Sequence, residues 1–243
     1  MFALYKRETI SLFSSPIAYL VISVYLIISG LFLWVFPQTS ILKGSTSELT
    51  AFFSLSPYLL IFLASAICMR SFSEERREGT LELLLTKPFS EWAVVLAKFL
   101  SCFTVILVAL LLTSVYYVSV YKLGSPVGNI DSASVVGSYI GLLLLAMVFC
   151  AIGVASSVLT ANQLVALLVS AILSYLLYDG FNSIAQLSFS GEIGYTLSRL
   201  GIDYHYFALS RGALDIGSAF YLSSMIVFFL ALCHLILRSR HWE

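Results

Sequence analysis

Residues 132–178 contain no Asp, Glu, Lys or Arg over 47 consecutive positions. A straight helix of that length would measure about 70 Å, more than twice the roughly 30 Å hydrocarbon core of a bilayer. The run must therefore turn, and its only polar cluster is Thr160-Ala161-Asn162-Gln163. We expect a tight hairpin there, between one membrane span at Val135–Leu159 and another at Leu164–Tyr178.

The composition indicates a membrane protein. Of the 243 residues, 60% are apolar and 11% are charged, whereas soluble domains carry about 25% charged residues. The 13 basic and 13 acidic side chains cancel, so no positive field favours nucleic acid as a partner. The cysteines lie singly in apolar runs, which predicts buried thiols rather than a zinc site or disulfides; they are Cys68, Cys102, Cys150 and Cys233.

Six apolar segments are long enough to cross a membrane, which predicts an all-α membrane protein with one transmembrane domain over residues 1–243. The expected spans are residues 17–36, 52–69, 94–120, 135–159, 164–178 and 219–237. Ser14 or Ser15 can cap the first span, and Pro16 suits its first helical position. No small-residue cleavage site precedes Pro37, so this run is expected to remain as an anchor rather than act as a secretory signal.

Six spans place both chain ends on the same side of the membrane. With that topology, nine of the 13 Lys and Arg residues fall on the side of the termini and four on the other. Loops on the cytoplasmic side are enriched in Lys and Arg. We therefore expect both termini in the cytoplasm.

Two further segments are not expected to span. Met1–Ser15 carries apolar side chains on roughly one helical face, which predicts an interfacial elbow helix leading into the first span. Phe181–Asp215 is too apolar for a solvated loop yet is broken by several glycines. We expect external short helices there, either re-entrant helices that dip into the outer leaflet or a plain helical cap outside the membrane.

The segment Arg70–Lys98 holds 10 of the 26 formal charges, and it lies between two apolar runs. Ser71 and Glu74 fit a capping box, Glu74 can pair with Arg77 one turn later, and Gly79 should end or bend this helix. A second short helix over Thr80–Thr86 would then place three leucines on one face before Pro88. This pattern favours an amphipathic element docked against something, although a solvated loop that only enforces topology is the alternative.

Motifs of several enzyme classes are missing. No phosphate-binding loop of the G-x-x-x-x-G-K-[ST] type occurs, so ATP hydrolysis by this chain is not expected. Glu74-Glu75 resembles the start of an intramembrane glutamate-protease motif, but Gly79 stands where that motif needs arginine. His205 lies beside Asp203 among tyrosines, which indicates an interfacial aromatic cluster rather than a metal site. Small residues of the fourth span permit close helix packing; they are Gly137, Gly141, Ala151, Gly153, Ala155 and Ser156.

The run EERREGTLELLLTKPFSEWAVVLAKFL resembles the cytosolic signature of the ABC-2 class of ABC-transporter permeases. The opening 36 residues, YKLGSPVGNID, LTANQLVA and DYHYFALSRGALD are similar to the gliding-motility-associated permeases of that class. The resemblance implies six transmembrane helices per subunit and a cytosolic coupling helix between spans two and three that contacts an ATPase. The residues implied in this coupling element are Glu74, Glu75, Arg76, Arg77, Glu78, Gly79, Thr80, Leu81, Glu82, Leu84 and Leu85.

The resemblance also implies the partners and the location. They would be a cytosolic ABC ATPase dimer that binds ATP and Mg, a second permease subunit of the same or another kind, and membrane lipid, in the bacterial inner membrane. The function expected is export of a substrate, or mechanical work in the envelope, driven by that ATPase, with no catalysis by this chain.

Two other function classes stay open at this point. A structural membrane anchor of a motility or envelope complex would use the same docking element without transport. A secondary transporter or channel would need ionisable or unwound sites within the membrane, and the predicted spans offer almost none.

Overall fold

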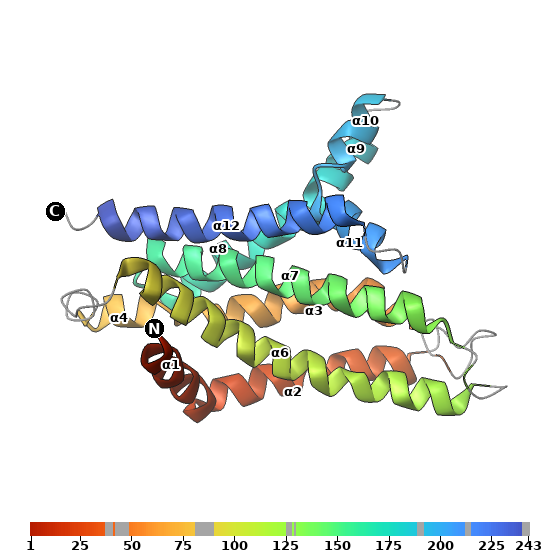
Figure 1. The fold of residues 1–243 in the computed structure, drawn as a ribbon, viewed down its shortest axis with the longest axis horizontal. Helices are drawn as coiled ribbons and strands as arrows, with labels where there is room; N and C mark the ends of the chain where they lie inside the picture. Colours follow the sequence, from red (N-terminus) through yellow and green to blue (C-terminus); the bar gives the residue numbers. More distant parts are fainter. Residues whose placement is uncertain are drawn as a thin grey trace.

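The computed structural model describes residues 1–36, 41, 49–80, 90–124, 128, 130–188, 192–211 and 215–239. These residues form helices and no strands (Figure 1). The helices are α1 (Phe2–Ser14), α2 (Pro16–Trp34), α3 (Thr50–Cys68), α4 (Ser73–Arg77), α6 (Glu91–Leu123), α7 (Ser132–Leu159), α8 (Gln163–Tyr175), a π-helical turn (Leu176–Gly180), α9 (Phe181–Ser188), α10 (Glu192–Ser198), α11 (Ile202–Ser210) and α12 (Ile216–Ser239).

Six helical segments of the described chain are long and apolar enough to cross a membrane, which confirms the predicted all-α membrane fold. The hairpin predicted at Thr160–Gln163 lies between α7 and α8, where Asn162 caps α8 by accepting a hydrogen bond from Leu164 N at 3.0 Å. Helices α2, α3, α6, α7 and α12 begin and end within about three residues of the expected spans. The fifth span is longer than expected, because the helix continues from α8 through the π-helical turn and α9 to give a segment over Gln163–Gln186.

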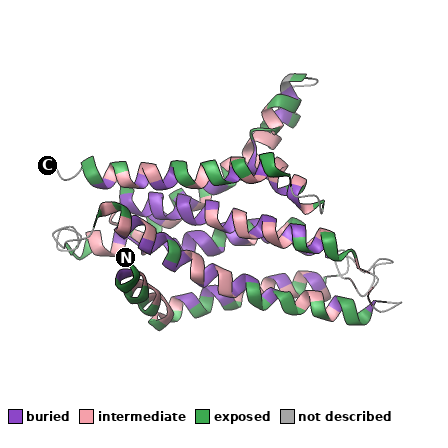
Figure 2. Ribbon diagram, viewed as in Figure 1, coloured by how far each residue is buried: buried purple, intermediate pink, exposed green. Residues whose placement is uncertain are grey.

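Helix α7 occupies the centre of the bundle and packs against α3, α6, α8, α11 and α12. In its most apolar window 78% of the residues are buried, compared with 22% for the segment that contains α8 and 28% for α12. Figure 2 shows this difference as a purple interior with green along the outer helices. The outer faces of α2, α8 and α12 are thus the surfaces available to lipid or to another subunit.

The small residues of α7 lie where neighbouring helices approach most closely. A Cβ atom on Gly153 would lie 2.6 Å from Cys68 Cβ of α3, and one on Gly141 would lie 3.0 Å from Tyr206 Cδ2 of α11. The prediction that this span packs tightly is confirmed, and the partners are helices of the same chain.

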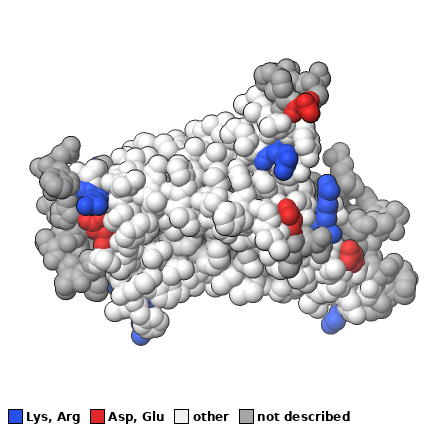
Figure 3. Space-filling model, turned by 45° about the horizontal axis from the view of Figure 1, so that its top comes forward, with Lys and Arg blue, Asp and Glu red and all other residues white. Residues whose placement is uncertain are grey.

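The described charges gather at the two ends of the bundle. Figure 3 shows one face with Lys, Arg, Asp and Glu near either end and an uncharged belt between them. The beginning of α1, helix α4 and the end of α12 lie at one end, and the end of α6 and the start of α7 lie at the other (Figure 1). This arrangement agrees with six crossings, since the start of α1 and the end of α12 lie at the same end of the bundle (Figure 1).

Helix α1 lies at an angle to α2 and packs mainly against α6 (Figure 1). Ser15 separates the two helices and accepts a hydrogen bond from Ile17 N at 3.4 Å, and Pro16 is the first residue of α2. The hydroxyl groups of Tyr5 and Thr104 are 2.9 Å apart, which joins α1 to α6. The predicted elbow is therefore a defined helix fixed to the bundle.

The segment between the fifth and sixth spans divides into two parts. Helices α9 and α10 pack on each other and project from the bundle, whereas α11 packs against α7 and α12 (Figure 1). The expected short helices are present, and the two predicted alternatives, re-entrant helices and a cap outside the membrane, both stay predictions. Helix α11 instead belongs to the core, with Ile202, Tyr206 and Leu209 fully buried.

The Tyr206 hydroxyl forms a hydrogen bond with a backbone carbonyl of α3 that would otherwise lack a donor. Pro57 lies inside α3 and has no N–H to donate to the carbonyl of Phe53, four residues earlier. The Tyr206 hydroxyl donates to that carbonyl oxygen at 2.8 Å, in a buried position. This bond explains how proline is tolerated in the middle of a core helix.

We expect Tyr206→Phe to lower the free energy of unfolding by about 1–2 kcal/mol, because a buried carbonyl loses its partner. The measurement is thermal unfolding of the purified chain in detergent. In the background Pro57→Ala, where residue 57 can donate to Phe53, the same substitution should cost clearly less. An equal loss in both backgrounds would contradict this explanation.

Candidate functional site

The charged element between α3 and α6 forms one end of the bundle, and its described part centres on α4. A turn over residues 69–72 follows α3, and Phe72 and Ser73 are fully buried. The Ser73 hydroxyl donates to the Met69 carbonyl. These contacts fix α4 against the bundle, so the alternative of a freely solvated loop does not describe residues 71–76.

The predicted capping box of α4 is wrong. The N-cap residue is Phe72, and no side chain caps the helix. The Glu74 carboxylate instead forms an ion pair with Arg70, with Nη2 2.7 Å from Oε1 and Nε 3.1 Å from Oε2. Glu74 therefore pairs with Arg70, three residues before the helix begins, rather than with Arg77 inside it.

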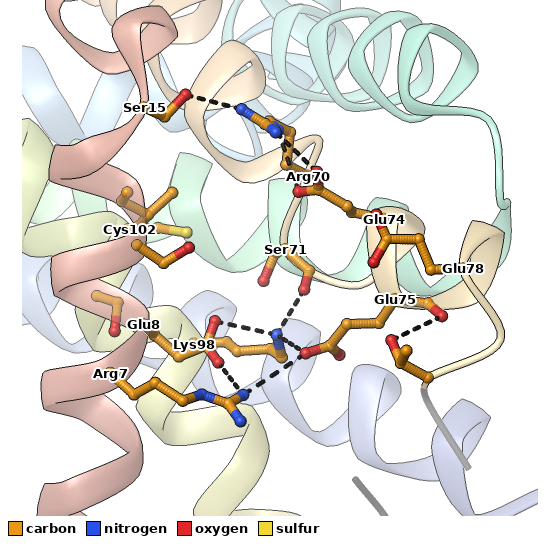
Figure 4. A pocket seen from close by; sticks show the side chains of 14 residues that line it. Arg7, Glu8, Ser15, Arg70, Ser71, Glu74, Glu75, Glu78, Lys98 and Cys102 are labelled. Carbon is orange, nitrogen blue, oxygen red and sulfur yellow. Dashed lines mark hydrogen bonds and ion pairs between the residues drawn. The ribbon is translucent and has the colours of Figure 1, made fainter. Parts of the chain in front are cut away.

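A buried lysine joins α1, α4 and α6. The Lys98 side chain of α6 is 2% exposed, and its Nζ lies 2.8 Å from Glu75 Oε1, 3.2 Å from Glu8 Oε2 and 2.7 Å from the Ser71 carbonyl oxygen (Figure 4). Arg7 Nη2 lies 2.5 Å from Glu8 and 3.8 Å from Glu75. We call Arg7, Glu8, Glu75 and Lys98 the Lys98 cluster.

Two arginines extend these contacts to further helices. Arg70 Nη1 donates to Ser15 Oγ, between α1 and α2, at 2.8 Å (Figure 4). Arg76 Nη1 donates to the carbonyl oxygen of Val158, in the last turn of α7, at 2.8 Å. Helix α4 is thus connected through side chains to α1, α6 and α7.

Electrostatics favour the charged form of Glu8. Burial alone raises the pKa of its carboxyl group, but Lys98 and Arg7 more than offset this, so the pKa lies below its usual range. At Glu75, by contrast, burial outweighs Lys98 and raises the pKa of the carboxyl group above its usual value. The cluster therefore surrounds a buried lysine with carboxylates in different environments, and its Arg7 side chain stays half exposed.

The structure divides the predicted coupling residues into two groups. Glu74, Glu75 and Arg76 are partly buried and bind the bundle, whereas Arg77, Glu78, Gly79 and Thr80 are exposed. Gly79 has φ +69°, which ends α4 at the predicted place because only glycine adopts that region without strain. Leu81, Glu82, Leu84 and Leu85, with the predicted second helix Thr80–Thr86, lie outside the described residues from position 81 onward.

Sequence reasoning missed Lys98, Arg7, Glu8 and Arg70 as parts of this site. A signal was present for Lys98, since it is a single charge two turns into an apolar helix that Ser90 caps. A lysine in that position needs an acidic partner or a path to water. The partner Glu8 is 90 positions away and could not be identified from spacing.

A cavity of about 520 Å³ opens between α1 and α4. Its lining includes the Lys98 cluster together with Ser71, Glu74, Glu78 and Arg70 (Figure 4). Volumes of about 300–1,000 Å³ are typical of ligand sites.

The opposite end of the bundle holds His205. Its ring stacks on Tyr221 with centroids 4.0 Å apart, and its two nitrogens lie 3.0 Å from Ser218 Oγ and from the Arg199 carbonyl oxygen. Both nitrogens therefore have hydrogen-bonding partners within the chain. This environment agrees with the predicted aromatic cluster.

A known family matches most of the chain. The profile of the family described as ABC-2 family transporter protein matches residues 49–237 of the 243. The matched part begins just before α3 and ends within α12, so it contains α4 and Lys98. No curated protein matches the chain.

Proposed function

Because this chain belongs to the ABC-2 transporter family and is therefore a permease subunit of an ABC transporter, we propose that α4 and the residues after it couple the membrane helices to a partner ATPase. Membership of the family implies association with an ABC ATPase and with membrane lipid. We also propose which residues receive the force that the ATPase exerts. They are the coupling element Glu74–Thr80 with Leu81, Glu82, Leu84 and Leu85.

The observation that supports this proposal best is the contact of buried Lys98 with three segments at once. Its Nζ binds Glu75 of α4, Glu8 of α1 and the Ser71 carbonyl that precedes α4. Since α4 also follows α3 directly in the chain, any displacement of α4 is transmitted to α1, α3 and α6 together. A loop without these contacts would absorb such a displacement.

The exposed residues of the coupling element suit a docking surface. Arg77, Glu78, Gly79 and Thr80 are exposed and follow the side chains that hold α4 in place. In the proposed cycle, ATP binding closes two ATPase subunits, their surface moves α4, and α3 and α6 change tilt relative to a second permease subunit. ATP shifts this equilibrium only through its different affinity for the two states.

The sequence similarity described above supports a narrower assignment as well. We propose that the chain is a permease of the gliding-motility-associated type in a bacterial inner membrane, with the α4 end in the cytoplasm. Purification in mild detergent with its native neighbours tests this. Recovery of an ABC ATPase together with other motility components is expected, and recovery without any ATPase would contradict the proposal.

The coupling element is tested by reversing its exposed charge. We expect Arg77→Glu to lower ATP-dependent activity of the reconstituted complex at least about tenfold, because like charges placed opposite one another at an interface cost several kcal/mol. Leu84→Glu, which places a charge on the predicted apolar face, should act in the same direction. The measurement is ATPase activity and flux in proteoliposomes that contain the co-purifying ATPase.

Lys122→Glu is the matched control, because Lys122 is an exposed basic residue in the last turn of α6 at the other end of the bundle. It should leave activity within twofold of the original chain. If Arg77→Glu and Leu84→Glu both retain full assembly and activity, the coupling role of this element is wrong.

A further inference from the structure

The open cavity between α1 and α4 brings opposite charges together. Three cationic side chains, Arg7, Arg70 and Lys98, line it together with four carboxylates, those of Glu8, Glu74, Glu75 and Glu78. Their formal sum is one negative charge. A net anionic ligand is therefore disfavoured, whereas a cation or a zwitterion is compatible.

Within the cavity, all three hydrogens of the Lys98 ammonium are used in hydrogen bonds, whereas some oxygen acceptors have no donor. The Lys98 ammonium has three hydrogens, and it contacts three oxygen acceptors, on Glu8, Glu75 and Ser71. Lys98 consequently has no hydrogen left for a ligand.

Two oxygens of the lining remain without a partner among the described residues. They are Ser71 Oγ, on a residue only 9% exposed, and Glu75 Oε2. Buried polar atoms are nearly always satisfied in folded proteins. Figure 4 shows Ser71 and Glu75 on the same side of the cavity, with Glu78 beside them. These groups call for a small donor with several N–H bonds.

We propose that this cavity binds a primary ammonium group, supplied by the headgroup of a zwitterionic aminophospholipid. An ammonium carries three donors and one positive charge, which matches Ser71 Oγ, Glu75 Oε2 and the Glu78 carboxylate. The side chains of Arg7 and Arg70 are 50% and 26% exposed, and the N–H groups of their guanidinium ends that are not already bonded suit the phosphate of the same headgroup.

The position of the cavity favours a lipid over a soluble amine. Helix α1 forms one wall, and its amphipathic pattern predicts that it lies in the membrane interface, where headgroups are concentrated. A bound headgroup would bridge α1 and α4. Only the consequence of that bridge for coupling rests on the proposed function, because binding itself needs no ATPase.

The test is native mass spectrometry of the delipidated chain in mild detergent, titrated with phosphatidylethanolamine or with phosphatidylcholine of the same acyl chains. Phosphatidylcholine keeps the positive charge but has no N–H donor. We expect phosphatidylethanolamine to bind at least about tenfold more tightly, since hydrogen bonds to charged groups have effects of this size.

Ser71→Ala and Glu78→Gln should each reduce this preference several-fold, and Ser54→Ala should leave it unchanged. Ser54 is an exposed serine of α3 whose hydroxyl donates to its own helix at Ala51 O. Glu78 is exposed, so its replacement tests the site even if Ser71→Ala perturbs folding.

Competition with a soluble headgroup shows whether the ammonium group must come from a lipid. If glycerophosphoethanolamine displaces the lipid at similar concentrations, the headgroup chemistry alone is sufficient and free amines can occupy the site. If it does not, the membrane lipid is the ligand. Equal binding of the two phospholipids, a preference for an anionic lipid, or a preference that survives both variants would overturn the proposal. The assay contains no ATP or ATPase, so such a result would leave the coupling proposal untouched.

Discussion

Replacing Lys98 with methionine is expected to lower the free energy of unfolding by about 3 kcal/mol. Removing one partner of a buried ion pair typically costs about 3–5 kcal/mol, because the other charge stays buried without compensation. Here two carboxylates lose their cation, but Glu8 and Glu75 are 16% and 18% exposed and Arg7 remains beside both. We therefore expect the lower end of the range. Thermal unfolding in detergent should show a Tm lower by about 6–12 °C for a chain of this size.

A multiple variant distinguishes the cost of leaving carboxylates unpaired from the cost of losing the packing contacts of Lys98. In Lys98→Met combined with Glu8→Gln and Glu75→Gln, no carboxylate is left unpaired, so most of the lost stability should return. Lys122→Met, at an exposed position in the same helix, should change stability by less than about 0.5 kcal/mol. If the multiple variant is as unstable as Lys98→Met alone, the cluster does not hold α1 and α4 in the way described.

The course of the chain through the membrane could be predicted because it depends on local properties. The absence of charge over residues 132–178 demanded a turn, and the polar residues Thr160–Gln163 form it. Capping residues mark the helix starts in the same way: the Asp131 carboxylate accepts hydrogen bonds from Ala133 N and Ser134 N at the start of α7. Run length and capping are both encoded by neighbouring residues.

The segment between the fifth and sixth spans was harder to predict, since its structure depends on distant partners. Tyr206 is buried because α11 lies against Gly141 of α7 and beside α3, where Pro57 leaves a carbonyl free. Neither fact is visible in the sequence around Tyr206. A composition of apolar residues broken by glycines describes both the projecting helices α9 and α10 and the buried helix α11.

Of the candidate site, only the features that depend on neighbouring residues could be predicted. Gly79 ends α4 as expected, because a positive φ is a local requirement of the chain. Lys98 entered the sequence argument as the last charge of the segment Arg70–Lys98 and as one of the positive charges that set orientation, without a partner. Its role depends on Glu8, which α1 brings to it from 90 positions away, and on the fold that buries both.

The second large effect is expected for Gly153→Ala. An alanine Cβ at this position would lie 2.6 Å from Cys68 Cβ, 3.1 Å from Cys68 Sγ and 3.3 Å from Ser170 Oγ. The nearest atom is attached directly to the backbone of α3, so a rotamer change cannot remove the clash and the helices must separate. Overpacking of this kind costs about 1–3 kcal/mol. We expect a value near the upper end, measured as a lower Tm in detergent, because α3, α7 and α8 meet at this point.

Gly30→Ala is the matched control for this prediction. Position 30 lies inside α2, where a Cβ atom would meet only the Tyr116 hydroxyl at 3.4 Å. Alanine is favoured over glycine within a helix by about 0.5–1 kcal/mol, so this variant should be as stable as the original chain or more so. Cys68→Gly removes the Cβ atom that Gly153→Ala meets, and the double variant should be more stable than the sum of the two single effects predicts. Strict additivity would mean that the α3–α7 contact is not the closest constraint on the position of α7, and that the central helix is held mainly by its other neighbours.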